Sequence, residues 1–338
     1  MDSLRITDES EVVFGLAGGP LPPRSDREAV VFLTQPGVAA GVTADLADGV
    51  SGLRTLVHVL EDREGAKELE AVGMVYDAMG EFNLGRHDTI VGVGGGAATD
   101  VAGFVAATWL RGVESVLVPT TLLAAVDAAI GGKTGINRGG KNLVGAFWLP
   151  SRVVVDLDLL AGLPERLLRE GAAEAVKAGL LADPVIVEEY SRHGLGADLG
   201  VIVPRAIAVK AEVVGDDLTE QGRRAILNFG HTIGHVVEVL APMPHGHAVS
   251  VGMVAAAVLS NARYGFDHRW LTALLFELGL PVAAAGVSIR AALDLVQRDK
   301  KRTADGTQMV LLRGVGDPVV ELVSPEELEA AMRAIGLS

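Results

Sequence analysis

The sequence predicts an α/β protein, with an N-terminal parallel-sheet domain followed by a mostly α-helical domain. Two observations predict this fold class. In the first half, short apolar runs alternate with helical patterns, as in parallel sheets with helical crossovers. After about Asp158, longer helical patterns dominate. We therefore expect two domains, spanning residues 1–158 and 159–338.

The strands of the predicted sheet are short apolar runs, with helical patterns over 65–82 and 99–110 between them. Continuous apolar runs of this length are typical of strands buried on both faces. The five runs are Ala29–Leu33, Leu56–Leu60, Thr89–Val93, Ser115–Val118 and Val153–Asp156.

The second half is predicted to consist of helices, with one late strand pair around Gln308–Leu312. Apolar residues recur there at the spacing of one helix face. The predicted helices cover residues 164–182, 204–214, 224–240, 249–264 and 289–298.

Composition limits the class of protein. The chain has 338 residues, of which 49% are hydrophobic and 21% charged, as in ordinary globular proteins. It has no cysteine, which excludes disulfides and thiolate metal sites. A net charge of −14 argues against a nucleic-acid partner. The polar N-terminus and the short apolar runs lead us to expect no signal peptide, no membrane partner and a cytoplasmic enzyme.

Histidines cluster in the stretch LNFGHTIGHVVE and just after it. His231 and His235 are four residues apart and so share one face of a helix, and His245 and His247 follow. A carboxylate for the same site is offered by Glu174 in EGAAEAVKAG. Two histidines with one carboxylate leave positions open on a zinc ion, which is typical of catalytic sites. The pattern therefore predicts a metal site.

A glycine-rich turn, VGVGGGAATD, connects a predicted strand to a predicted helix at residues 91–100. Glycines let the main chain approach a phosphate, and the start of a helix favours an anion. The spacing differs from GxGxxG, so an ordinary turn would explain the glycines about as well. The strand before it and the helix after it favour a Rossmann-like nucleotide site.

The segment 119–145 is rich in glycine and carries two lysines, Lys133 and Lys141. Such a loop suits the recognition of phosphates or polyols. Further basic residues occur at Arg111, Lys210 and Arg224, although the chain is acidic overall. We therefore expect a small phosphorylated and carboxylated substrate.

Several long motifs resemble the 3-dehydroquinate synthase family of sugar phosphate cyclases, and its actinobacterial branch in particular. The resemblance runs from about Glu61 to Gly316 and is loose over the first sixty residues. The motifs are GGGAATDVAGFVAATWLRG, VPTTLLAAVDAAIGGKTGIN, GKNLVGAF, LPERLLREGAAEAVKAGLLAD, LNFGHTIGH, HGHAVSVGM and RDKKR.

The resemblance implies an enzyme that converts 3-deoxy-D-arabino-heptulosonate 7-phosphate to 3-dehydroquinate and phosphate. It implies NAD that is used catalytically and regenerated, and Zn²⁺, with Co²⁺ as an alternative. It also implies a homodimer in which Arg111 reaches the neighbouring site. The implied metal ligands are Glu174, His231 and His245, which makes His235 a nearby acid, base or phosphate-side group instead.

The resemblance also assigns two sets of residues, and one of Lys300 or Lys301 as a group that closes over the site. The catalytic and substrate-binding set is Arg111, Asp127, Lys133, Asn142, Lys177, Lys210, Arg224, Asn228 and His235. The NAD-binding set is Asp62, Glu64, Lys67, Gly95, Gly96, Ala97, Ala98, Thr99, Asp100, Thr120, Thr121, Lys133, Lys141, Leu159 and Gly162.

The sequence departs from the family pattern in three places. His247 stands where most members have glutamate, and the stretch from His235 to His245 and the loop INRGGKN are short. Thr34-Gln35-Pro36 replaces an acidic turn, and a Gln-Pro turn at this position is also typical of the actinobacterial branch. The alternatives are an aminodehydroquinate synthase or another sugar phosphate cyclase, an NAD- and metal-dependent polyol dehydrogenase, and an inactive homologue.

Overall fold

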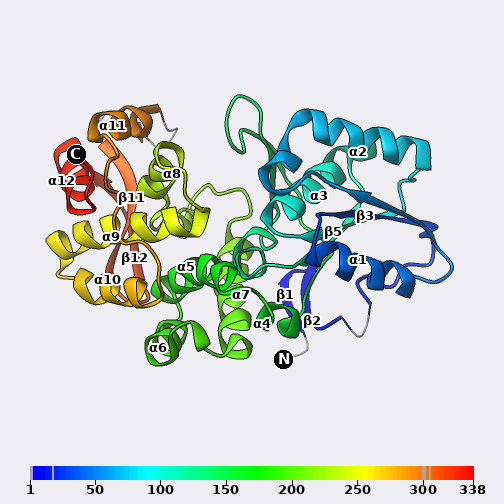
Figure 1. Cartoon of the computed structure of the whole chain (residues 1–338), viewed down its shortest axis with the longest axis horizontal. Helices are drawn as coiled ribbons and strands as arrows, with labels where there is room; N and C mark the ends of the chain where they lie inside the picture. Colours follow the sequence, from blue (N-terminus) through cyan, green and yellow to red (C-terminus); the bar gives the residue numbers. More distant parts are fainter. Residues whose placement is uncertain (1–2, 17–18, 299–301, 304–305) are drawn as a thin grey trace. The chain divides into compact units, whose positions relative to one another are not determined.

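The computed structural model of the protein describes residues 3–16, 19–298, 302–303 and 306–338 (Figure 1). The chain forms two compact units, each built from two segments. The first unit comprises Met1–Leu163 and Lys210–Thr219, and the second comprises Pro164–Val209 and Glu220–Ser338. The mixed α/β fold class is as predicted. The boundary at residue 158 and the functions of the two domains stay predictions.

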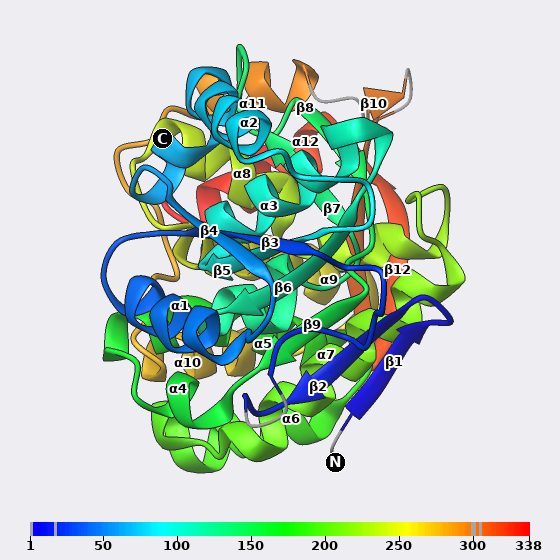
Figure 2. The same ribbon diagram turned by 90° about the vertical axis from the view of Figure 1, so that its right-hand side faces the viewer.

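A seven-stranded sheet forms the centre of the first unit, in the order β1-β2-β9-β6-β5-β3-β4 (Figure 2). Neighbouring strands run parallel, except in the antiparallel hairpin β1–β2, which the sequence analysis missed. The strands are β1 (Ser3–Thr7), β2 (Ser10–Phe14), β3 (Ala29–Thr34), β4 (Arg54–Val59), β5 (Thr89–Gly94), β6 (Glu114–Pro119) and β9 (Arg152–Val155).

Helices cover both faces of this sheet. Helix α1 (Val38–Gly49) packs on the face that carries Phe32 and Val91, where the buried apolar cluster of the unit lies. Helix α3 (Gly96–Thr108) packs on the other face, where a Cβ at Gly92 would lie 2.4 Å from the Ala102 Cβ. Because successive side chains of a strand alternate between faces, each strand contributes to both layers.

The remaining elements of the first unit are short apart from α2 (Leu69–Phe82). The helix predicted over 65–82 is divided, since Glu68 is extended between a 3₁₀ helix and α2. The other elements are η1 (Arg63–Lys67), η2 (Trp109–Arg111), the π-helical turn η3 (Ala124–Ala128), the hairpin β7 (Lys133–Ile136) and β8 (Val144–Phe147), and α4 (Leu157–Ala161).

Strand β4 corrects one expectation. The run Leu56–Leu60 was predicted to be buried on both faces, but β4 is the edge strand. Val57 and Val59 are 44% and 56% exposed in the single chain. An edge strand has a partner on one side only, so its apolar side chains are less covered.

The second unit is mostly helical, as predicted, with a small antiparallel sheet. Its central helix α9 packs against α5, α8, α10, α12 and β11. No helix in the described parts of the chain has the length and apolarity needed to cross a membrane. The elements are α5 (Glu165–Leu181), α6 (Pro184–His193), η4 (Gly194–Gly196), α7 (Leu199–Asp216), which ends in the first unit, η5 (Arg223–Asn228), α8 (His231–Leu240), α9 (His245–Tyr264), α10 (His268–Glu277), α11 (Ile289–Arg298), β10 (Arg302–Thr303), β11 (Gly306–Gly314), β12 (Asp317–Val323) and α12 (Pro325–Ala334).

The prediction of one continuous helix over residues 224–240 is wrong. The 3₁₀ helix η5 ends at Asn228, and Gly230 then takes a left-handed conformation with φ of 77° before α8 begins. A Cβ at Gly230 would lie 2.6 Å from the Met253 Cγ. The break lets α8 start directly against α9, which places His231 at a helix N-terminus.

The close approach of α8 and α9 predicts a large stability effect at Gly252. A Cβ there would lie 1.8 Å from the Gly230 carbonyl oxygen, so Gly252→Ala must push the helices apart. We expect a loss of about 1–3 kcal/mol in the free energy of unfolding. The measurement is the thermal unfolding of the full-length protein, followed by calorimetry.

Gly73→Ala in α2 is the matched control, because no atom lies within 4 Å of the added Cβ. Alanine is the better helix former, so this variant should be neutral or slightly more stable. Equal transition temperatures for Gly252→Ala and the unmodified protein would contradict the proposed packing constraint.

Candidate metal site and nucleotide-binding residues

Three side chains of the second unit meet at one point. Glu174 comes from α5, and His231 and His245 are the first residues of α8 and α9. The Nε2 atoms of His231 and His245 lie 3.4 and 3.5 Å from the same oxygen, Glu174 Oε1. Glu174 is 2% exposed and His231 is 8% exposed. A buried carboxylate is thus faced by two imidazole nitrogens.

Small residues bring these helices close enough. A Cβ at Gly246 would lie 2.1 Å from the Glu170 carbonyl oxygen, so α9 begins in direct contact with α5. Glu170 precedes Glu174 by one helical turn, and Gly246 follows His245. The contact therefore places His245 beside the carboxylate, as the turn at Gly230 does for His231.

The second ring nitrogen of each histidine is also engaged. His231 Nδ1 lies 3.2 Å from the Phe229 carbonyl oxygen, and His245 Nδ1 lies 3.1 Å from Glu238 Oε2. Because these partners only accept hydrogen bonds, the proton of each neutral ring is assigned to Nδ1. A neutral ring in this tautomer has the lone pair of Nε2 available for a cation, on the side that faces Glu174.

The charges around Glu174 favour its ionised form. Burial opposes ionisation, but Lys177, whose Nζ lies 2.5 Å from Glu174 Oε2, and His231 hold the pKa of the carboxyl well below its ordinary value. Burial and the neighbouring Lys177 lower the pKa of His231 well below its ordinary value. Burial also acts against a charge on His245, but the carboxylates of Glu174 and Glu238 raise its pKa to about 9.

The residues fit a divalent cation. Both oxygens of Glu174 are buried, and apart from the ion pair with Lys177 neither receives a hydrogen bond from the described residues. Such atoms cost free energy unless another group compensates them. Two imidazole nitrogens and one carboxylate oxygen form a zinc ligand set that leaves positions for substrate or water.

His235 lies next to this group. Its ring centroid is 5.2 Å from that of His231 and 6.1 Å from that of His245, and its side chain is exposed. With Glu238 and His245 it forms a second group of metal-ligating atoms that overlaps the first at His245. The sequence analysis missed Glu238, although its spacing from His231 and His235 places all three on one helix face.

Other predicted residues of the second unit lie on neighbouring elements. Arg224 is 1% exposed on η5, and Asn228 Nδ2 donates to Glu220 Oε1 at 2.7 Å. His247 is half-buried on the first turn of α9, where burial and Arg169 lower its pKa. Lys300 and Lys301 lie outside the described residues.

The glycine-rich turn lies between β5 and the start of α3, as the sequence predicts. Residues 95–100 form the N-cap and first turns of α3. Thr120 and Thr121 follow the neighbouring strand β6, and the Thr120 main-chain N–H donates to the Gly94 carbonyl oxygen at 2.9 Å. A Cβ at Gly95 would lie 3.4 Å from Thr121 Cγ2. The structure thus brings these predicted cofactor residues together.

Charged residues of the predicted NAD set meet near this turn. Lys67 is 2% exposed and forms an ion pair with Asp100. Burial raises the pKa of the Asp100 carboxyl to about 6, although the charge of Lys67 acts to lower it. Lys141 Nζ lies 3.6 Å from Glu64 Oε1. The Asn137 main-chain N–H donates to the Lys67 carbonyl oxygen at 2.8 Å, which ties the hairpin loop to η1.

Lys210 and Asp127 form a second charged pair in the first unit. Lys210 Nζ donates to Asp127 Oδ1 at 2.5 Å and to the Asp127 carbonyl oxygen at 2.6 Å. Asp127 lies in the π-helical turn η3, a geometry that occurs often at functional sites. Lys133 is exposed at the start of the hairpin β7–β8, and Asn142 lies in the loop of this hairpin with φ of 55°.

Four predicted residues stand apart from these clusters. Asp62 is exposed, and its carboxylate lies 3.6 Å from the guanidinium of its neighbour Arg63. Leu159 and Gly162 lie at α4, where the Leu159 main-chain N–H donates a hydrogen bond to the N-cap residue Asp156. Arg111 is exposed at the end of η2.

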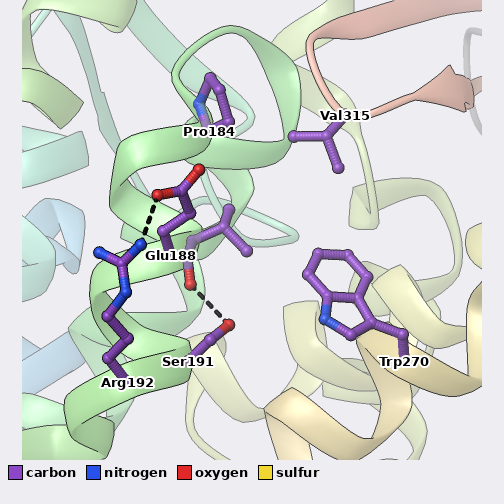
Figure 3. A pocket seen from close by; sticks show the side chains of 7 residues that line it. Pro184, Glu188, Ser191, Arg192, Trp270 and Val315 are labelled. Carbon is purple, nitrogen blue, oxygen red and sulfur yellow. Dashed lines mark hydrogen bonds and ion pairs between the residues drawn. The ribbon is translucent and has the colours of Figure 1, made fainter.

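A pocket of about 360 Å³ in the second unit contains none of the predicted site residues (Figure 3). Trp270 of α10 and Val315 face α6 across it. At its rim, Arg192 Nη2 lies 2.9 Å from Glu188 Oε2. The pocket therefore does not mark the metal site.

Comparison with known proteins gives the family. Models of the N-terminal and C-terminal parts of 3-dehydroquinate synthases match residues 57–170 and 171–302. The chain is 44% identical over 331 residues to the 3-dehydroquinate synthase of Mycolicibacterium vanbaalenii, which covers 92% of this chain and 91% of the relative.

Solved structures of related enzymes share the fold. A 2-deoxy-scyllo-inosose synthase complexed with carbaglucose-6-phosphate, NAD⁺ and Co²⁺ matches with a TM-score of 0.87 and 27% identity over 99% of both chains. The 2-epi-5-epi-valiolone synthase ValA from Streptomyces hygroscopicus, with NAD⁺ and Zn²⁺ bound, matches with a TM-score of 0.85 and 28% identity over 96% of both chains. A glycerol dehydrogenase from Schizosaccharomyces pombe, with a TM-score of 0.67 and 16% identity over 91% of this chain and 83% of its own, shares only the fold. The chain belongs to the 3-dehydroquinate synthase family.

Proposed function

We propose that the protein is a 3-dehydroquinate synthase, which converts 3-deoxy-D-arabino-heptulosonate 7-phosphate to 3-dehydroquinate and phosphate. The observation that carries the proposal is the buried group of Glu174, His231 and His245 with Lys177 beside it, in a chain of this family. The group supplies the ligand set of a catalytic metal ion. The cytoplasmic location stays a prediction.

Glu174, His231 and His245 would hold Zn²⁺, with Co²⁺ as the alternative, since the two cyclase structures described above contain these ions. The turn at residues 95–100, Thr120 and Thr121 would hold NAD, together with Glu64, Lys67 and Lys141. When bound, NAD⁺ takes up and returns a hydride, and the cation polarises the substrate oxygens.

Basic side chains of the chain would hold the substrate anions. Lys177 and Lys210 each form an ion pair with a carboxylate, that of Glu174 and that of Asp127, which orients their ammonium groups. Buried Arg224 offers a planar donor set that suits phosphate. Lys133, Asn142, Asn228 and His235 complete the substrate set. Holding a reactive intermediate in one orientation is the main catalytic contribution of such groups.

We also propose a homodimer in which Arg111 serves the neighbouring subunit. Leu110 and Arg111 both have positive φ, 49° and 66°, a strained geometry that is often kept at functional sites. The Arg111 side chain makes no hydrogen bond or ion pair with the residues that the structure describes. Leu110 and Leu143 are 40% and 67% exposed, as expected of a surface that another subunit covers.

The function is tested by following phosphate release from 3-deoxy-D-arabino-heptulosonate 7-phosphate with NAD⁺ and Zn²⁺, while absorbance at 340 nm is recorded. We expect phosphate without a lasting gain of NADH, because the hydride returns to the substrate. A chelator should abolish turnover, and Zn²⁺ should restore it.

Two outcomes would redirect the assignment. A net gain at 340 nm without phosphate would favour a polyol dehydrogenase. Phosphate released only from the amino-sugar analogue of the substrate would favour an aminodehydroquinate synthase.

The charge on His245 predicts how metal affinity depends on pH. The pKa of this histidine is raised to about 9, so below that pH the metal-free site carries a proton that Zn²⁺ must displace. We expect the affinity to rise by about tenfold per pH unit between about 6.5 and 8.5. Chelator competition at several pH values measures this. An affinity that stays constant above pH 7, as for a histidine of ordinary pKa, would contradict the charge assignment.

The role of Arg111 is tested by complementation. Arg111→Ala and Lys133→Ala should each inactivate the homodimer. In a mixed dimer, one site receives both intact residues, so random exchange should restore about a quarter of full activity in a two-fold symmetric dimer. No recovery after subunit exchange has been confirmed by mass spectrometry would refute a shared site.

A further inference from the structure

His245 uses its two ring nitrogens in opposite directions. Nε2 lies 3.5 Å from Glu174 Oε1, and Nδ1 lies 3.1 Å from Glu238 Oε2. Glu238 is on the last turns of α8, seven residues before His245. The side chains of Glu238 and Glu174 are 14% and 1% exposed, so both carboxylates interact with the ring in a largely desolvated setting. Hydrogen bonds to charged acceptors are strong in such surroundings.

We propose that Glu238 is a positioning residue for the metal ligand His245. Its carboxylate accepts the Nδ1–H of the ring, fixes the tautomer and points the lone pair of Nε2 toward the cation. The proposal rests on the metal assignment made under Proposed function. In metal sites generally, a partner of this kind orients the ring and makes it more basic.

The two histidine ligands differ in how they are held. His231 is oriented by a main-chain carbonyl, that of Phe229, which any residue at position 229 would provide. His245 depends on a side chain, and so on the identity of residue 238. A short connection, Ala241–Pro244 with prolines at 242 and 244, joins the helices that carry Glu238 and His245. Proline fixes φ, which restricts the ways in which this connection can move.

A competing interpretation is that His235, Glu238 and His245 bind a second cation of their own. The two arrangements need different states of His245. A ring that donates Nδ1–H to Glu238 cannot use Nδ1 as a metal ligand. Burial favours the first arrangement, since Glu174 and His231 are buried whereas His235 is exposed.

The test compares Glu238→Met with Glu238→Gln in the full-length protein. Both keep the length of the side chain, but only glutamine retains an oxygen that accepts Nδ1–H. Glu277→Gln on α10, an exposed residue, controls for the lost charge. Zinc affinity is measured by competition with a chromophoric chelator, and the Co²⁺-substituted proteins are compared by their visible absorption.

We expect zinc to bind Glu238→Met about 10–100-fold more weakly, with an altered Co²⁺ spectrum. Glu238→Gln should stay close to the unmodified protein, and Glu277→Gln should equal it. Glu238→Ala repeats the comparison if the methionine variant does not fold. Equal zinc affinity and equal spectra for all variants would overturn the proposal.

Stoichiometry separates the competing interpretation. Two zinc ions per unmodified chain, falling to one in Glu238→Met, would show a second cation site and overturn the positioning role. These measurements use no substrate. A protein that binds zinc as expected but releases no phosphate would therefore refute the proposed function alone.

Discussion

The buried carboxylate of Glu174 is the constraint on which the arrangement of the second unit depends. An ionised group that is 2% exposed must be compensated by positive charge or by a cation. Lys177 supplies one charge from the same helix, and the starts of α8 and α9 supply two imidazoles. Three helices must therefore converge on one atom. Glycines at the contact points allow this, because larger residues would hold the main chains apart.

Charged pairs organise the first unit in a similar way. Lys67 and Asp100 join segments that are 33 residues apart, and Lys210 and Asp127 join segments that are 83 residues apart. Buried ion pairs contribute little net stability, but loss of one partner leaves an uncompensated charge. These ion pairs therefore act mainly on which packing of the segments forms, and little on the free energy of unfolding. In both units the residues assigned to cofactor or substrate are the same ones that fix the local geometry.

The sequence predicted the parallel sheet, because runs such as Ala29–Leu33 have the length and the β-branched content of buried strands. The family resemblance named the three residues that the structure brings together at the metal group. The sequence analysis missed the hairpin β1–β2, whose strands are short and mix polar with apolar residues. The break at Gly230 was also missed. The helical spacing of apolar residues continues through this position, while the conformation of Gly230 depends on its contact with Met253. The spacing of His231 and His235 gave no sign that His245 lies nearer to Glu174, because that proximity comes from tertiary packing.

The path of the chain through the two units bears on how the protein is made. Helix α7 starts among the residues of the second unit and ends among those of the first, where Lys210 meets Asp127 and Gly215 lies against the Ile6 carbonyl oxygen. Domains usually fold in order as they leave the ribosome. Here the first unit cannot acquire its last segment until helices α5 and α6 have also been synthesised. Completion of the first unit is thus coupled to translation of part of the second, and neither gene fragment alone encodes a complete unit.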